Sequence, residues 1–206
     1  MKLAVFDFDS TLVDAETLEV LGEVYGVGEQ IKSVTTQAME GKADFYTSLI
    51  SRVALLKGMD THTAKKACES LPLHQGAKEV VQGLHALGYK VVCFSGGFKW
   101  ATGYFKEKLG LDADFSNTLH TKEGRLSGQV SGPMMRSDSK AEMLASLQEL
   151  LRVERTLAIG DGANDISMFK LADLSIAFNA KEITKEHADI IARSLDLREI
   201  LEYLKA

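Results

Sequence analysis

Short apolar runs that end in polar clusters recur along the chain. The first covers residues 3–8 and is rich in Val, Leu and Phe, and three more follow at residues 89–94, 156–159 and 174–178. Uninterrupted apolar runs of this length are typical of parallel strands that are buried on both faces. We therefore predict a strand at each run and a functional loop at each polar cluster.

Helical periodicity separates these predicted strands. The helical segments cover residues 76–87, 98–109, 140–151 and 164–172. Strands that alternate with helices indicate an α/β fold, in which a doubly wound, mainly parallel sheet is covered by helices on both faces. Ligands of such sheets bind at the carboxyl ends of the strands.

Residues 15–73 interrupt this alternation. They predict several helices with glycines near the breaks, at residues 15–25, 29–39, 44–56 and 61–70. We interpret this segment as a small helical cap domain, inserted into a catalytic core domain formed by residues 1–14 and 74–206. A second irregularity, at residues 115–130, predicts a β-hairpin.

Composition narrows the possible partners. The 206 residues are 45% hydrophobic and 26% charged, with a formal net charge of −5 and no dense Lys/Arg block, so a nucleic acid is not an expected partner. No apolar stretch is long enough to span a bilayer, and Asp7 and Asp9 interrupt the first apolar run before a signal core is complete. We expect no membrane partner and a cytoplasmic location.

Cys68 and Cys93 lack metal-binding spacing, which favours free thiols over a disulfide. No pattern indicates an oligomeric state.

Two acids stand at the end of the first predicted strand, in Phe6-Asp7-Phe8-Asp9-Ser10-Thr11. In an extended segment Asp7 and Asp9 point to the same side. They could be solvated loop acids or caps of the following helix. Two carboxylates at the end of a buried strand repel each other, however, and a bound cation would relieve that repulsion. The pattern therefore favours a functional site.

A second acid cluster follows the third predicted strand, in Gly160-Asp161-Gly162-Ala163-Asn164-Asp165. A structural reading makes Asn164 a helix N-cap and places Asp165 favourably at the helix dipole, but it leaves Asp161 unexplained. The third glycine of a dinucleotide fingerprint is missing, and an acid in that turn would repel a pyrophosphate. We exclude dinucleotide binding.

Two weaker signals complete the set. Ser95-Gly96-Gly97 follows a strand and opens a helix, where a hydroxyl and free N–H groups could cradle a phosphate, although the tripeptide is also a common turn. No P-loop motif and no G-x-S-x-G elbow are present. Lys140, taken alone, is one surface lysine among many.

Together these four motifs resemble, in composition and order, those of the haloacid dehalogenase-like phosphatases. The resemblance implies that Asp7 is a nucleophile that forms an aspartyl-phosphate and that Asp9 is a general acid and base. It further implies a Mg²⁺ ion held by the Asp7 carboxylate, the Asp9 backbone carbonyl and Asp161, with Asp165 orienting a metal-bound water. The residues implied in phosphate binding are Ser95, Gly96, Lys140 and Asn164.

The cap segment resembles the phosphoserine phosphatases within that family, in stretches that include residues 38–42 and 48–58. The resemblance implies that Arg52 grips the substrate carboxylate, that Glu16 pairs with its ammonium group, and that Met39 and Phe45 form an apolar wall. On spacing alone, these are a helix-face arginine, a first-turn acid and core residues. The implied reaction converts O-phospho-L-serine to L-serine and phosphate, the last step of serine biosynthesis.

Three alternatives stay open at this point. The same chemistry could act on another small phosphomonoester, or the phosphoryl group could pass to an acceptor alcohol instead of water. From a different class, the fold could serve as a non-catalytic sensor of a phosphorylated ligand. The pair Asp7 and Asp9 argues against the sensor, because a sensor needs no nucleophile.

Overall fold

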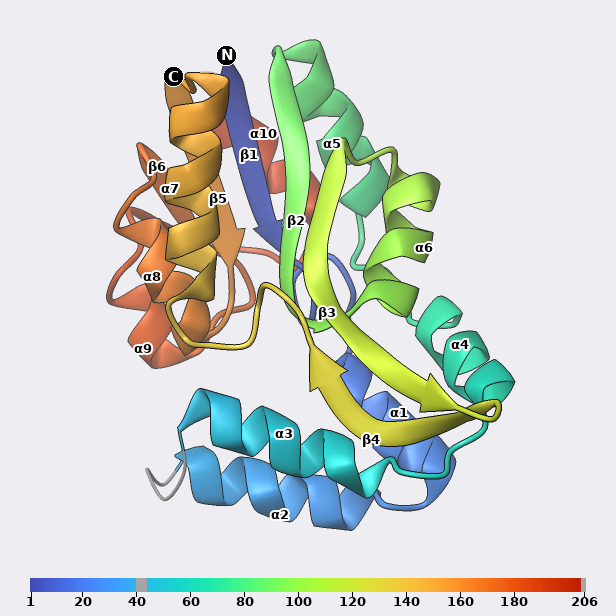
Figure 1. Ribbon diagram of the computed structural model, residues 1–206. Coiled ribbons are helices and arrows are strands. Elements are labelled where there is room, and N and C mark those ends of the chain that lie inside the picture. The colour runs from blue at the N-terminus through green and yellow to red at the C-terminus, as the bar shows by residue number, and fades with distance from the viewer. Residues whose placement is uncertain (40–43, 205–206) are drawn as a thin grey trace.

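A computed structural model describes residues 1–39 and 44–204. Within these residues, a seven-stranded sheet with the order β4-β3-β2-β1-β5-β6-β7 forms the centre of the molecule (Figure 1). Its strands are β1 (Lys2–Asp7), β2 (Tyr89–Phe98), β3 (Ala113–Lys122), β4 (Arg125–Ser131), β5 (Arg155–Gly160), β6 (Leu174–Ala177) and β7 (Ile190–Ile191). All neighbouring strands pair in parallel except β3 and β4, which form an antiparallel hairpin.

Helices lie on both faces of the sheet and beyond its carboxyl edge (Figure 1). In chain order they are α1 (Thr17–Tyr25), α2 (Gly28–Met39), α3 (Phe45–Leu55), α4 (Thr61–Glu69), α5 (Ala77–Ala86), α6 (Lys99–Leu109), α7 (Ser139–Leu151), α8 (Ile166–Phe169), α9 (Glu182–Lys185) and α10 (Ile200–Tyr203). Two short 3₁₀ helices, η1 (Ala163–Asp165) and η2 (Leu197–Glu199), complete the set. The predicted α/β class, with its mainly parallel sheet covered on both faces, is confirmed.

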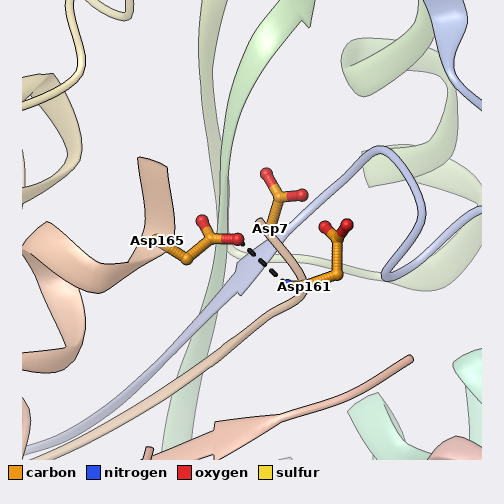
Figure 2. Close-up of side chains that lie close together, drawn as sticks. All are labelled: Asp7, Asp161 and Asp165. Carbon is orange, nitrogen blue, oxygen red and sulfur yellow. Dashed lines mark hydrogen bonds between the residues drawn. The ribbon is translucent and has the colours of Figure 1, made fainter. Parts of the chain in front are cut away.

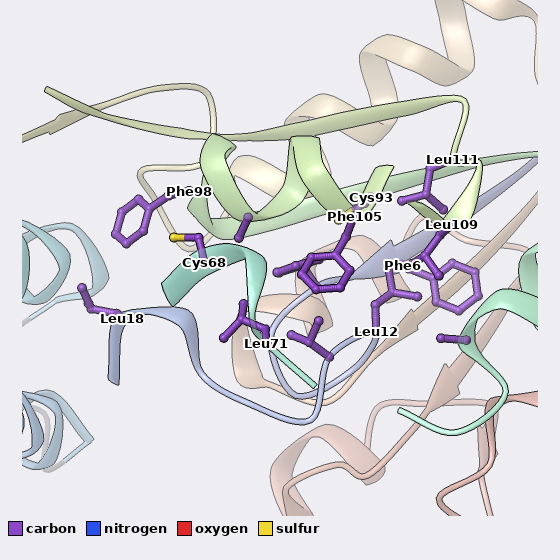
Figure 3. Packing of buried hydrophobic residues seen from close by; sticks show 14 of the residues in the cluster. Phe6, Leu12, Leu18, Cys68, Leu71, Cys93, Phe98, Phe105, Leu109 and Leu111 are labelled. Atoms are coloured by element: carbon purple, nitrogen blue, oxygen red, sulfur yellow. The ribbon is translucent and has the colours of Figure 1, made fainter. Parts of the chain in front are cut away.

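The central strands are apolar throughout because both of their faces are buried. Along β1, Ala4 and Phe6 enter a large hydrophobic cluster that also contains side chains of α5 and α6 (Figure 3). The alternating residues Leu3 and Val5 enter a second cluster with side chains of α7 and α8. Each fully buried large apolar side chain contributes about 1.5–3 kcal/mol relative to an exposed one. This burial fixes which side chains of β1 enter each cluster, and the parallel pairing of β1 with β2 and β5 places Asp7 at the carboxyl edge of the sheet.

Helices α1, α2 and α3 lie beyond that carboxyl edge, while α4 lies beside α6 (Figure 1). The β3–β4 hairpin extends out of the sheet toward them. Gly58 donates a backbone hydrogen bond to Leu126 of β4 at 2.9 Å, and Leu126 donates to Met59 at 2.8 Å. The helical segment is therefore attached to the hairpin as well as through its two chain connections. The exact division into core and cap domains stays a prediction.

Two predicted elements differ from the structure. The helix expected at residues 164–172 is shorter and begins as the 3₁₀ turn η1 before α8. The carboxylate of Asp165, rather than Asn164, caps this turn, because its Oδ2 accepts the N–H groups of Asp161 and Gly162 at 3.0 Å. Ser95-Gly96-Gly97 belongs to the end of β2 instead of opening a helix, and the pairing of β2 with β3 shifts register there.

The chain beyond residue 178 carries elements that its periodicity did not predict. These are α9, β7, η2 and α10, each two to four residues long. Segments of that length contain too few residues to establish a helical or strand period. Among the described residues, no helix has the length and apolar character required to cross a membrane. Cys68 and Cys93 are buried free thiols.

Candidate active site

Three carboxylates meet at the carboxyl edge of the sheet. Asp7 is the last residue of β1, Asp161 directly follows the neighbouring strand β5, and Asp165 ends η1. One oxygen of each carboxylate lies within 4.8 Å of the other two, and Figure 2 shows the three side chains grouped around one point. All three side chains are buried. The pairing of β1 with β5 thus brings Asp7 beside Asp161 and Asp165, which lie far from it in the chain.

Lys140 provides the positive charge at this cluster. It lies at the start of α7 and is 3% exposed. Its Nζ donates to Asp165 Oδ1 at 2.5 Å and also to Asp7 Oδ1. Burial alone would lower the pKa of Lys140, but Asp165 and Asp7 raise it above its usual value. The ammonium group is therefore charged at neutral pH. Because its side chain is buried, Lys140 is not one of the surface lysines.

With all three acids ionised, the cluster would carry more negative charge than Lys140 balances. Burial raises the pKa of Asp7 well above its usual value, and Asp165 and Asp161 add to this against the opposing effect of Lys140. Burial, followed by Asp165 and Glu16, raises the pKa of Asp161 to about 7. Buried carboxylate oxygens in excess of their cations are the donor set that a hard divalent metal ion binds. The residues present therefore fit a divalent metal.

Asp9 lies beside this cluster and is held by two elements. Its Oδ1 accepts the backbone N–H of Thr17 at 2.7 Å and the Thr17 hydroxyl, so it also caps α1. Its Oδ2 accepts the hydroxyl of Ser95 at 3.3 Å. Burial, followed by the nearby Glu16, raises the pKa of Asp9 to about 7. A carboxyl group with such a pKa can both give and take a proton near neutral pH.

The residues 95–97 form a tight loop against Asp9. Gly97 donates its backbone N–H to Ser95 Oγ at 2.8 Å. A Cβ on Gly97 would lie 2.7 Å from Asp9 Oδ2, and one on Gly96 would lie 3.1 Å from the ring of Phe45. A side chain at either position would force the Asp9 carboxylate or the Phe45 ring to move, so glycine lets acid and ring approach the backbone this closely. The loop can therefore present its backbone to a small anion.

A cavity of about 680 Å³ lies between this edge of the sheet and helices α1 to α3. Of the residues predicted from the sequence, those that line it are Asp7, Asp9, Glu16, Phe45, Arg52, Gly96, Asp161 and Asn164. Ser95, Lys140 and Asp165 do not line it, but they contact its acids from behind. Met39 ends α2, and its side chain lies outside the described part of the chain.

Arg52 projects from α3 into this cavity. It is half-buried, and its Nε donates to the carbonyl of Ser48 at 3.2 Å. Burial lowers the pKa of Arg52, while Glu16, directly before α1, and Glu19 on α1 oppose the shift. Glu16 accepts a hydrogen bond from the hydroxyl of Ser10 at 2.8 Å. The cap side of the cavity thus offers both a guanidinium and carboxylates, in addition to the acids of the sheet.

The structure adds lining residues that the sequence reasoning missed, namely Leu18, Glu19, Thr35, Ser48, Leu49 and Lys181. Glu19 could have been found, because it stands three residues after Glu16 in the helix predicted at residues 15–25, and residues at this spacing are neighbours on a helix surface. Lys181 carried no such signal. It reaches the cavity because its N–H donates to the carbonyl of Asp161 at 3.0 Å.

The chain is similar in sequence to a family of hydrolases and to individual proteins of known function. A model of the haloacid dehalogenase-like hydrolases matches residues 1–173. The chain is 57% identical to a phosphoserine phosphatase of Wolinella succinogenes, with 99% of this chain and 100% of the relative covered. It is 48% identical to a phosphoserine phosphatase of Methanocaldococcus jannaschii, with 99% of this chain and 98% of the relative covered.

Solved structures of phosphoserine phosphatases are also similar to this chain. A phospho-aspartyl intermediate analogue of phosphoserine phosphatase is similar to this chain with a TM-score of 0.92 and 47% identity, and 98% of each chain is covered. A substrate-bound phosphoserine phosphatase complex gives a TM-score of 0.92 and 46% identity over 98% of this chain and 97% of that one.

Proposed function

The chain belongs to the haloacid dehalogenase-like hydrolase family, and we propose that it hydrolyses O-phospho-L-serine to L-serine and phosphate through a phosphoaspartate at Asp7. The observation that carries this proposal is the two-sided cavity. Its sheet side holds Asp7 and Asp9 beside Lys140, and its cap side holds Arg52 and Glu16. One side suits a phosphoryl group, and the other suits the carboxylate and ammonium of an amino acid.

The first half of the reaction transfers the phosphoryl group to the protein. An oxygen of Asp7 attacks phosphorus, and the bond from phosphorus to the serine oxygen breaks. Asp9 gives its proton to that leaving oxygen, which is consistent with a pKa of about 7 that keeps part of the group protonated at neutral pH. The products of this half are serine and an acyl phosphate on Asp7.

The second half restores the carboxylate. Asp9, now ionised, takes a proton from a water molecule that attacks the phosphorus of the acyl phosphate. The bond between phosphorus and the Asp7 oxygen breaks, and inorganic phosphate leaves. The contacts of Asp9 to Thr17 and Ser95 hold its carboxyl group in one place through both halves.

Charge is the main obstacle, because a carboxylate must approach a phosphate dianion. Lys140 lowers this repulsion from behind Asp7, and the Gly96 backbone, Ser95 and Asn164 would position the phosphoryl oxygens. A Mg²⁺ ion, held by the Asp7 and Asp161 carboxylates and the Asp9 backbone carbonyl, with Asp165 orienting a bound water, would neutralise the remaining charge. The grouping of Asp7, Asp161 and Asp165 supports this assignment.

Recognition of the amino-acid end would come from the helical cap. The planar fork of Arg52 would bind the substrate carboxylate, and Glu16 would bind the ammonium group. Phe45 lies over Gly96 and would exclude water from the phosphoryl end. A cytoplasmic location and a place in serine biosynthesis stay predictions that follow from this activity.

Phosphate release from phosphoserine, phosphothreonine and p-nitrophenyl phosphate in Mg²⁺ tests the proposal. We expect phosphoserine to be the preferred ester. Asp7→Asn should lower turnover of every ester by about 10⁴-fold or more, because the nucleophile is lost. Arg52→Ala should lower kcat/KM for phosphoserine by about 100-fold and leave p-nitrophenyl phosphate nearly unchanged, since a buried charge-assisted pair is worth about 3 kcal/mol.

The controls separate the alternatives. Arg52→Lys keeps the charge and loses the planar fork, so its activity should lie between those of the wild type and Arg52→Ala. An equal loss for all esters in Arg52→Ala would refute the carboxylate-binding role. Phosphate binding without turnover of any ester would support a ligand sensor, and phosphorylated alcohols appearing in place of free phosphate would indicate a transferase.

A further inference from the structure

We propose that Asn117 is a positioning residue that holds two phosphate-recognising parts of the site, the Ser95–Gly97 loop and the segment leading to Lys140, in register with each other. This inference deepens the proposed function and rests on it. Asn117 lies in β3, outside the cavity, and none of the sequence motifs contains it. Its side chain is fully buried, so its amide must find partners inside the protein.

One partner is the loop that faces the substrate. The side-chain amide nitrogen of Asn117 donates to the carbonyl of Gly96 at 3.0 Å. This bond exists because β2 bulges at the loop: Phe94 pairs with Phe115, yet Phe98 pairs with Asn117, so four steps along β2 correspond to two along β3. The bulge takes the loop backbone out of the regular ladder, and the side chain of Asn117 supplies a bond that the ladder does not.

The other partner is the segment between β4 and α7. Met134 donates its N–H to Asn117 Oδ1 at 2.9 Å, and the Asn117 amide nitrogen donates to the Met134 carbonyl at 3.0 Å. Both backbone groups of Met134 are thus bound by one side chain. Six residues later, Lys140 lies in the first turn of α7 and contacts Asp7. The two hydrogen bonds between Asn117 and Met134 therefore constrain the position of the backbone that leads to Lys140.

A third observation is that a glycine, Gly132, lies directly against the side chain of Asn117. Gly132 has a φ of +154°, and a Cβ there would lie 2.6 Å from both the Cα and the Oδ1 of Asn117. Glycine therefore permits the segment to pass directly against this side chain. Loss of the three hydrogen bonds would leave the Ser95–Gly97 loop and the Lys140 segment free to shift independently of each other.

Loss of the Asn117 hydrogen bonds should weaken binding of the phosphate group and not binding of the amino-acid part of the substrate. A displacement of about 1 Å in a phosphate-binding group can cost about 100-fold in rate. The described hydrogen bonds of the Asn117 side chain go to Gly96 and Met134 and not to α1 or α3, so recognition by Arg52 and Glu16 should be independent of it. The expected signature is weaker binding of every phosphate-containing ligand with unchanged binding of serine.

Asn117→Ala and Asn117→Asp test this in the full-length protein with Mg²⁺, using inorganic phosphate and L-serine as ligands in calorimetry. We expect the Kd of inorganic phosphate to rise by about tenfold or more in both variants, and kcat/KM to fall by a similar factor for phosphoserine and p-nitrophenyl phosphate. The Kd of serine should stay within twofold. Asn117→Asp keeps the volume but turns an acceptor toward two carbonyls, so its effect should be at least as large.

Ser116→Ala is the matched control. Ser116 is the buried neighbour in β3, and the described hydrogen bond of its hydroxyl goes to Thr102 of α6 at 2.7 Å and not to either segment. It should lower the melting temperature without changing the Kd of phosphate. A purely structural role of Asn117 would lower the folded fraction in the same way. An unchanged Kd of phosphate in folded Asn117→Ala would therefore overturn the proposal.

Gly132→Ala decides the matter if the Asn117 variants do not fold. It should displace the amide and raise the Kd of phosphate. Where Asn117→Ala does fold, its effect and that of Gly132→Ala should not add in the double variant Asn117→Ala/Gly132→Ala. An unchanged Kd in Gly132→Ala would also count against the proposal. Failure of the wild type to hydrolyse phosphoserine, with phosphate binding that still depends on Asn117, would refute the substrate assignment alone.

Discussion

Three consecutive residues at the end of β1 show how alternation builds the site. Asp7 lies in the cavity wall, Phe8 is fully buried against Phe105 with ring centroids 5.7 Å apart, and Asp9 returns to the cavity. The phenylalanine between the acids fixes the backbone that carries both carboxylates, because its ring has one place to pack. The acids are therefore held close together despite their repulsion.

That repulsion leads to a prediction at the residue scale. Addition of Mg²⁺ to the metal-free protein should raise its melting temperature, since the ion would bind the folded acid cluster and not the unfolded chain. At a concentration about 100 times the Kd, the gain is about 2.7 kcal/mol, or roughly 5–10 °C for a chain of this size. Differential scanning calorimetry with and without EDTA measures it.

Asp161→Asn should abolish most of this Mg²⁺-dependent rise, because it removes one carboxylate of the cluster. The matched control is Asp138→Asn, whose exposed carboxylate pairs with Arg136 away from the cavity. It should keep the full response. An equal response in both variants would show that the ion binds elsewhere.

At the scale of single elements, buried carboxylates hold the short segments in place by accepting hydrogen bonds from them. The 3₁₀ turn η1 exists because Asp165 accepts two backbone N–H groups of the loop that it terminates. The C-terminal segment uses Glu199 in the same way. Its carboxylate accepts from Arg193 Nε at 2.9 Å, from the Ser194 backbone at 2.8 Å and from the Tyr203 hydroxyl.

These bonds determine how Glu199 responds to pH. Burial alone would raise its pKa, but the hydrogen bonds from Tyr203, Ser194 and Arg193 outweigh burial and lower it to about 2. A carboxyl group whose pKa is lower in the folded state stabilises the fold above its unfolded pKa, about 4.3. That contribution is lost as the pH falls from there toward about 2.

Glu199→Gln should therefore lower the free energy of unfolding by about 2 kcal/mol at pH 7, the usual worth of hydrogen bonds to a charged group. Urea titrations at several pH values should show the difference from the wild type shrinking below about pH 4. Glu202→Gln removes a charge from the same segment, but its carboxylate is largely exposed and 3.8 Å from Arg193. It should change stability by less than about 0.5 kcal/mol at any pH.

At the scale of the whole molecule, helices α1 to α4 and the sheet share one hydrophobic cluster. Leu49, Val53 and Leu56 of the α3 region belong to the same cluster as Phe6 of β1 and Phe105 of α6. Backbone hydrogen bonds between Gly58, Met59 and Leu126 add a second attachment. Two parts that share a core lose stability together, so we expect the chain to unfold in a single transition.

Leu56→Ala tests this coupling, because Leu56 is fully buried in the helical segment. It should lower the free energy of unfolding by about 2–5 kcal/mol. The transitions seen by far-UV circular dichroism and by fluorescence of the single Trp100, on α6 of the sheet side, should move together. Val24→Ala, on an exposed face of α1, should shift neither by more than about 0.5 kcal/mol. Separate transitions would show that the cap folds independently.

The amino-acid sequence by itself determined the class of fold and the positions of most catalytic candidates. Apolar runs buried on both faces leave little choice but a parallel sheet, and acids at the ends of such runs are costly unless they serve a site. Asp7, Asp9 and Asp161 were therefore visible from local pattern alone. Lys140, Arg52 and Glu16 were not, and their expected roles came from resemblance to a family.

Only the tertiary structure decided which of these groups touch. Lys140 is 133 residues from Asp7, and no local period reports a contact over that distance. The direct grouping of Asp165 with Asp7 and Asp161, the approach of Lys181 to Asp161, and the bridge made by Asn117 all depend on strand register and on the paths of loops. Side-chain periodicity shows which face of an element is buried, whereas the packing of distant elements determines what that face meets.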